Sequence, residues 1–114
     1  MAAILVADDV SIDSAGTDGL TTEISLVIPL NGANAVQMAI LVFALTATNI
    51  SLQLEVSLDG SNWVAKGSAQ TLTAIGRKLF TTETAVAAGF ARIKYSLTGS
   101  GKAIFKSWLN ISTQ

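Results

Sequence analysis

The sequence contains no cysteine and no histidine among its 114 residues. Without cysteine the chain has no disulfide, no thiolate metal ligand and no thiol nucleophile. Without histidine it lacks the commonest general base, the usual zinc ligand and the side chain that ordinarily activates a serine. We therefore expect a protein that is not an enzyme, with no catalytic residues, no cofactor and no bound metal.

Charged residues are also scarce. They make up 13% of the chain, against roughly 25% in an average soluble domain, and the mean hydropathy is +0.53. The longest apolar run, residues 38–45, is eight residues long, whereas a membrane-spanning helix needs about 20. The N-terminal stretch has no basic residue before its short apolar run, so it does not resemble a secretory signal. The composition favours a chain that stays out of the membrane and covers much of its surface with other subunits; a well-packed monomer rich in serine, threonine and alanine is the alternative.

The few charges are separated along the chain. Residues 1–60 hold seven acidic and no basic residues, and residues 61–114 hold seven basic residues and one acidic residue, so the two parts carry −7 and +6. These charges either pair within one subunit, or an acidic arm of one copy lies on the basic face of the next. Nucleic acid is disfavoured as a partner, because the acidic charge matches the basic charge and aromatic residues are only 6%.

Apolar and polar residues alternate over much of the chain, which is typical of half-buried strands. Residues 51–58 alternate throughout. Residues 23–30 are expected to point Ile24, Leu26, Ile28 and Leu30 inward, with Pro29 on the outer face near a strand end or sheet edge. Both segments are predicted to be strands of a sheet with one buried face.

The C-terminal part predicts two more strands, at residues 91–97 and 102–112. Gly99-Ser100-Gly101 separates them, and two alternating runs around a glycine-bearing turn are typical of a β-hairpin. Lys102 after this turn superficially suggests a phosphate loop, but the full glycine, lysine and hydroxyl spacing is missing.

Residues 35–45 are almost continuously apolar, which suits either a strand buried on both faces or a buried helix; their β-branched and aromatic residues favour the strand. Shorter strands are predicted around residues 10–12, 63–66, 70–74 and 78–82. We therefore predict an all-β fold, a single antiparallel β-sandwich or jelly roll of about eight strands. Residues 1–22 form an N-terminal acidic arm or edge strand in this interpretation, and residues 23–114 form the sandwich domain.

Two local features invite a binding role. Asp59-Gly60 ends the strand at residues 51–58, and Trp63 follows it; Asp-Gly is favoured in turns because glycine accepts a positive φ and aspartate caps the turn. Trp63 is interpreted as covering one end of the core, with a contact or sugar-stacking role as the alternative. Trp108 falls on the same strand face as Lys106 and Asn110, which makes it the better interface candidate.

The segments LTATNISLQLEVSLDGSNWVAKG and GFARIKYSLTGSGKAIFKSWLNI resemble small β-sandwich virion proteins of tailed bacteriophages. The resemblance covers roughly residues 45–111 and rests on a strand that ends in serine, a variable residue, Asp-Gly and a nearby tryptophan. It implies a non-enzymatic structural protein located in the virion and made in the bacterial host cytoplasm, such as a capsid decoration (cement) protein or a head, neck or tail component. Discoidin-like carbohydrate-binding modules carry similar SLDGSNW strands and are the alternative.

The partners implied are further copies of the chain, as a homo-oligomer, and a major capsid or other virion protein. Our hypothesis is that apolar anchors and aspartates in the N-terminal segment dock on a neighbouring subunit, opposite a basic patch on the predicted hairpin. The predicted interface residues are Ile4, Val6, Asp8, Asp9, Val10, Ile12, Arg92, Lys94, Lys106 and Trp108.

Overall fold

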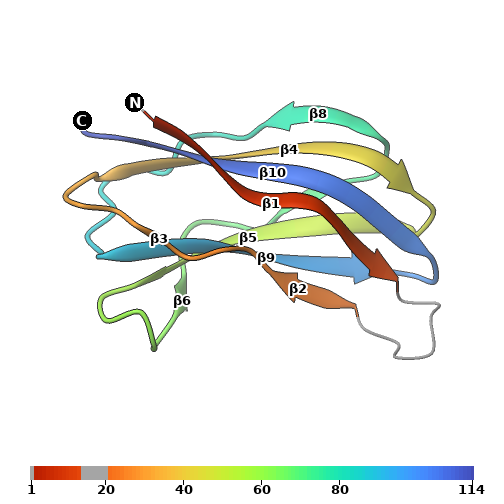
Figure 1. Cartoon of the computed structure of the whole chain (residues 1–114), viewed down its shortest axis with the longest axis horizontal. Helices are drawn as coiled ribbons and strands as arrows, with labels where there is room; N and C mark the ends of the chain where they lie inside the picture. Colours follow the sequence, from red (N-terminus) through yellow and green to blue (C-terminus); the bar gives the residue numbers. More distant parts are fainter. Residues whose placement is uncertain (1, 14–20) are drawn as a thin grey trace.

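The computed structural model describes residues 2–13 and 21–114 and shows two antiparallel sheets packed face to face, with no helix among these residues. One sheet has four strands in the order β1-β10-β4-β8 (Figure 1). These strands are β1 (Ala2–Asp13), β10 (Lys102–Ser112), β4 (Ala35–Leu45) and β8 (Gly76–Leu79). The all-β sandwich prediction is confirmed.

The second sheet has six strands, with β2-β9-β5-β6 as its main path; β3 also pairs with β9, and β7 with β5. These strands are β2 (Thr22–Ile24), β3 (Ile28–Pro29), β5 (Asn49–Ser57), β6 (Val64–Ala65), β7 (Gln70–Leu72) and β9 (Phe90–Thr98). The described residues thus form ten strands where about eight were predicted, in part because residues 23–30 divide into β2 and β3.

The core lies between the sheets and is built by the inward residues of the long strands. Leu52, Leu54, Ile93 and Tyr95 come from the six-stranded sheet, and Phe105 comes from the four-stranded sheet. The Tyr95 and Phe105 rings lie 4.5 Å apart between centroids, so the two layers meet there. The predicted alternation of β5, β9 and β10 is therefore confirmed, except at the end of residues 51–58, where Ser57 is buried and Leu58 is 80% exposed because β5 ends at Ser57.

Tyr95 carries the one polar group of this contact. Its hydroxyl is buried and makes no hydrogen bond of ordinary geometry, although Ser25 and Ser107 are its polar neighbours. Burial raises the pKa of Tyr95 far above its ordinary value. The tyrosine therefore stays neutral and acts as a packing residue.

Two local predictions are wrong. The turn at Gly99-Ser100-Gly101 does not close a hairpin, because β9 belongs to one sheet and β10 to the other. It is a corner that carries the chain across the sandwich. The second error concerns residues 25–27, which interrupt the predicted strand: Ser25 is buried, whereas Ile24 and Leu26 are 44% and 67% exposed.

β1 is the edge strand of the four-stranded sheet and pairs with β10 along its length (Figure 1). Its register slips between Leu5 and Ala7 and again between Ala7 and Val10, and Asp9 adopts a positive φ of 52°. Each slip is a β-bulge that adds one residue to β1. The first bulge changes which alternate residues of β1 face the core, and the second changes them back. The segment 14–20 of the predicted N-terminal arm lies outside the described residues.

Candidate interaction surface

The outer face of the six-stranded sheet is polar, as expected for a sheet with one solvated face. Arg92 and Glu55 on neighbouring strands form an ion pair there, with 2.9 Å between Nε and Oε1. The outward positions of β5 and β9 are occupied by Ser51, Gln53, Glu55, Arg92, Lys94 and Ser96.

Trp63 packs on this polar face rather than in the core. The guanidinium carbon of Arg92 lies 4.2 Å from the centroid of the Trp63 ring, a cation–π contact, and the indole is half-buried. The interpretation that Trp63 covers one end of the core is therefore wrong. One face of the ring is occupied by Arg92, which leaves less aromatic surface for stacking on a sugar.

The turn that precedes Trp63 is organised by Asp59. Its Oδ1 accepts hydrogen bonds from the backbone amides of Asn62 and Ser61, both at 2.9 Å, and its Oδ2 accepts one from the Asn62 side chain at 2.8 Å. These donors, the Asn62 amide first, hold the pKa of Asp59 far below its ordinary value. Gly60 takes the positive φ, at 80°. The carboxylate is used to shape the turn, and the described residues contain no group of three or more side chains suited to holding a metal.

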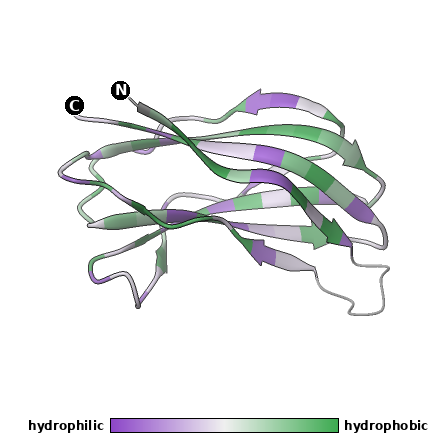
Figure 2. Ribbon diagram, viewed as in Figure 1, coloured by the Kyte–Doolittle hydropathy of each residue, from purple (hydrophilic) through white to green (hydrophobic). Residues whose placement is uncertain are grey.

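The outer face of the four-stranded sheet differs, because apolar side chains occupy about half of its outward positions and several of them are large. Phe43 and Leu79 are 46% and 59% exposed, and Leu5 is 39% exposed. Figure 2 shows β4 as hydrophobic along most of its length. We call this surface the apolar outer face and define it by Leu5, Leu41, Phe43, Leu79, Ile104 and Trp108.

Four charged side chains lie at the centre and along the two edges of the apolar outer face. Lys106 at its centre hydrogen-bonds Asp8, and its Nζ lies 3.2 Å from Oδ1 of Asp9. Asp8, and then Asp9, hold the pKa of Lys106 above its ordinary value. Both aspartates lie on the β1 edge and stay more than half exposed, whereas Arg77 lies on the opposite edge, in β8.

A shallow hollow lies within this face beside Trp108. It has a volume of about 260 Å³ and is lined by Ala3, Ala39, Ile40, Arg77, Leu79, Trp108 and Asn110. Its floor is low because alanine occupies the β4 position paired with Trp108. The hollow combines an indole, a guanidinium and an amide, which suits either an apolar side chain of a partner or a small polar ligand.

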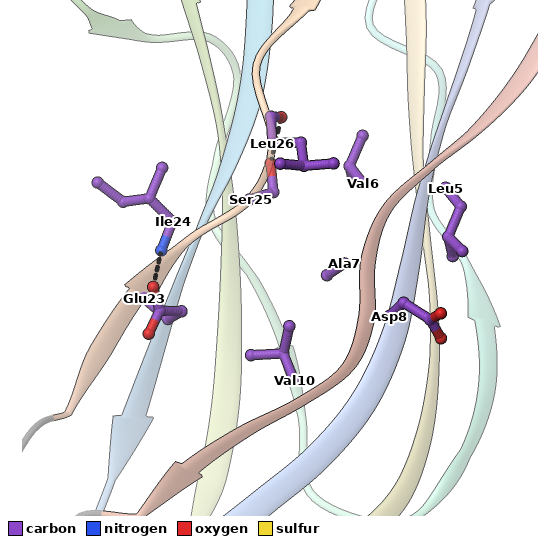
Figure 3. Close-up of a pocket in the computed structure, with 9 residues that line it drawn as sticks. All are labelled: Leu5, Val6, Ala7, Asp8, Val10, Glu23, Ile24, Ser25 and Leu26. Atoms are coloured by element: carbon purple, nitrogen blue, oxygen red, sulfur yellow. Dashed lines mark hydrogen bonds between the residues drawn. The ribbon is translucent and has the colours of Figure 1, made fainter.

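A second hollow, of about 440 Å³, opens at the edge of the sandwich between β1 and residues 23–26 (Figure 3). Val6, Ala7 and Val10 line it from β1, and Leu26 lies across from them; the Leu26 amide donates to the Val6 carbonyl at 3.0 Å. In Figure 3, Leu5 and Asp8 lie on the other side of β1. The hydrogen bond between Leu26 and Val6 joins the two sheets along an edge where the side chains of Ile24 and Leu26 remain exposed.

The structure separates the predicted interface residues into three groups. Val6 and Ile12 are buried in the core, and Ile4 and Val10 pack partly against it, so none of these four is an exposed anchor. Asp8, Asp9, Lys106 and Trp108 lie together on the outer face of the four-stranded sheet.

The third group, Arg92 and Lys94, lies on the opposite outer face, so the predicted basic patch with Lys106 does not exist. The patch was predicted by taking β9 and β10 as one hairpin. Ion pairs join Lys106 to Asp8 and Asp9, and Arg92 to Glu55. Acids from the first part of the chain therefore pair within the subunit with bases from the second.

No protein-family model and no curated protein matches the chain. Solved structures do match. One is a chain from the structure of infectious bursal disease virus, Gx strain, with a TM-score of 0.58 and 12% identity over 98% of this chain. Another is a CBM4, a carbohydrate-binding module, with a TM-score of 0.50 and 20% identity over 80% of this chain. This chain spans 31% and 61% of the lengths of those two chains, and identities this low show the β-sandwich fold alone.

The apolar outer face contains residues that the sequence interpretation did not select, namely Leu5, Leu41, Phe43, Leu79 and Ile104. The signal was present in residues 35–45, whose nearly continuous apolar character is typical of a strand buried on both faces. In this chain only the inner face of β4 is covered by the sandwich.

Proposed function

We propose that the protein is a non-enzymatic structural subunit of a virus particle, held in place by contacts of the apolar outer face. The observation that carries the proposal is the contrast between the two outer faces of one sandwich. The central strands β5 and β9 of the six-stranded sheet present polar side chains to solvent, with Ile24 on the β2 edge as an exposed apolar neighbour. The four-stranded sheet presents leucine, isoleucine, phenylalanine and tryptophan beside its few charged residues. Contiguous apolar surface of this kind marks an interaction site.

The finer form of the proposal is a capsid decoration (cement) protein of a tailed bacteriophage, located in the virion. Two things support it: the resemblance of residues 45–111 to such proteins, and the structural similarity to a chain of a virus structure. The low charge content also suits a protein with neighbours on several sides.

A carbohydrate-binding module is the second candidate. The similarity to a CBM4 supports it, and so does the hollow in which Trp108 adjoins Arg77 and Asn110. An indole beside polar donors is a composition that suits a sugar ring.

Particle purification tests the two candidates. We expect the chain to co-purify with particles through a density gradient and to be present there in many copies by quantitative mass spectrometry, while the purified chain binds nothing on a glycan array. A chain that is absent from particles but binds glycans, with binding abolished by Trp108→Ala, would contradict the structural role and establish the second candidate.

A further inference from the structure

We propose that the apolar outer face packs against the same face of a second copy of this chain, in a twofold-symmetric dimer. The inference deepens the proposed function by naming the partner of this surface. It rests on the order of side chains across the sheet, which makes the face complementary to itself.

Strand pairing places the outward side chains in rows that cross the sheet. One row runs Leu5, Trp108, Ala39, Leu79, from the β1 edge to the β8 edge. The neighbouring row begins with Asp8 and Asp9 at the β1 edge, continues through Lys106 and Leu41, and ends with Arg77 at the β8 edge. The first row therefore has leucine at both ends, whereas the second has opposite charges at its two ends.

A twofold axis parallel to the strands turns each row onto itself with its ends exchanged. The β1 edge of one copy then faces the β8 edge of the other, so Asp8 and Asp9 lie opposite Arg77 of the second copy. An axis across the strands would instead set the β1 edges, and the exposed carboxylates on them, against each other. Charge complementarity selects the first arrangement.

The same operation also matches the shapes of the two faces. In the first row Trp108 comes opposite Ala39 of the second copy, where the hollow of about 260 Å³ lies. A large indole thus meets a small residue, and Leu5 meets Leu79. Large side chains set against small ones are what allows two sheet faces to interdigitate.

The size of the face is adequate for such a contact. At about 3.3 Å per residue and about 4.8 Å between strands, the four-stranded sheet covers roughly 600 Å² in projection. Each partner buries about 800 Å² in a standard interface, so a dimer of moderate affinity is expected. Edge-to-edge pairing through β1 is disfavoured, because two bulges interrupt that edge.

The first test compares two leucines that are both exposed. Leu79→Lys places a charge on the apolar outer face, whereas Leu58→Lys makes the same change at a side chain that is 80% exposed and lies elsewhere. By sedimentation equilibrium the wild-type chain should dimerise, Leu79→Lys should weaken the dimer by about tenfold or more, and Leu58→Lys should leave it unchanged. A wild-type chain that stays monomeric, or two variants that behave alike, would overturn the proposal.

The second test uses the charges. Arg77→Glu and Asp8→Lys should each weaken self-association, because each sets like charges opposite one another. An equimolar mixture of the two variants should associate more tightly than either alone. In a mixed dimer the introduced lysine faces the introduced glutamate, and the native Asp8 faces the native Arg77. A mixture no tighter than its components would contradict the strand-parallel axis. A chain that dimerises in this way but is absent from particles would refute the proposed function and leave this inference standing.

Discussion

Deleting residues 1–13 is expected to abolish the cooperative fold. The deletion removes β1, which pairs with β10 along its length, and takes Val6 and Ile12 out of the core, where they are 1% and 3% exposed. Fully burying a valine or isoleucine side chain contributes about 1.5–3 kcal/mol each. With Ile4 and Val10 partly buried as well, the loss approaches the roughly 5–15 kcal/mol that stabilises a whole domain. Far-UV circular dichroism and urea unfolding should show no cooperative transition.

Adjacent residues of β1 provide a matched pair that separates the core from the surface. Val6→Asp places a carboxylate in the core and should be nearly as damaging as the deletion. Leu5→Asp changes a neighbouring side chain on the outer face and should leave the unfolding transition largely intact. A truncated chain that still unfolds cooperatively would show that the segment is an arm, as the sequence hypothesis held.

Gly101→Ala is expected to be the most damaging single-methyl change in the chain. Gly101 lies at the corner between the sheets with φ of 145°, and an added Cβ would come within 2.6 Å of the backbone of Thr46 and Ala47. That backbone belongs to a second connection between the sheets at this end of the strands, residues 46–48, which bonds to the ends of β9 and β10. Strain of this kind costs about 1–3 kcal/mol, and the backbone clash adds to it. We expect a loss of about 3 kcal/mol or more, which lowers Tm by about 12 °C or more in a domain of this size.

Gly32 supplies the control for this change. Its φ is 87°, and nothing lies within 4 Å of an added Cβ. Gly32→Ala should therefore cost only the backbone strain of about 1–2 kcal/mol. If differential scanning calorimetry gives the two variants equal values of Tm, the close approach of the two corners does not contribute to stability.

The sequence was informative where a strand alternates without interruption. β5, β9 and β10 each bury every second residue, so period two was enough to predict them and the all-β class. It was less informative for β1: residues 1–22 were left as an acidic arm or an edge strand, because Asp8 and Asp9 interrupt the apolar pattern, and the structure shows the edge strand. In the structure both aspartates occupy a bulge opposite Lys106, an arrangement that depends on a residue 98 positions away.

The candidate surface was harder to predict for a related reason. Whether a glycine-bearing turn closes a hairpin or crosses between sheets depends on which strands lie beside it, and local sequence does not specify this. Because residues 99–101 were predicted to close a hairpin, Lys106 and Arg92 were predicted to lie on the same face, whereas they lie on opposite faces of the sandwich. Trp108 was selected as an outward side chain because it alternates with Lys106 and Asn110. The structure agrees, since its neighbours Ser107 and Leu109 are both buried. The apolar residues around it became visible only when β1, β10, β4 and β8 were placed side by side.

The most direct measurement of the central claim is the solvent access of Trp108 in the assembled and dissociated chain. The sequence has two tryptophans, so Trp63→Phe leaves Trp108 as the single reporter and keeps an aromatic ring beside Arg92. We predict that acrylamide quenching of Trp108 fluorescence falls severalfold as the protein concentration is raised through the assembly range, and that Leu79→Lys abolishes this protection. Quenching that is independent of concentration would contradict the claim that assembly covers the apolar outer face.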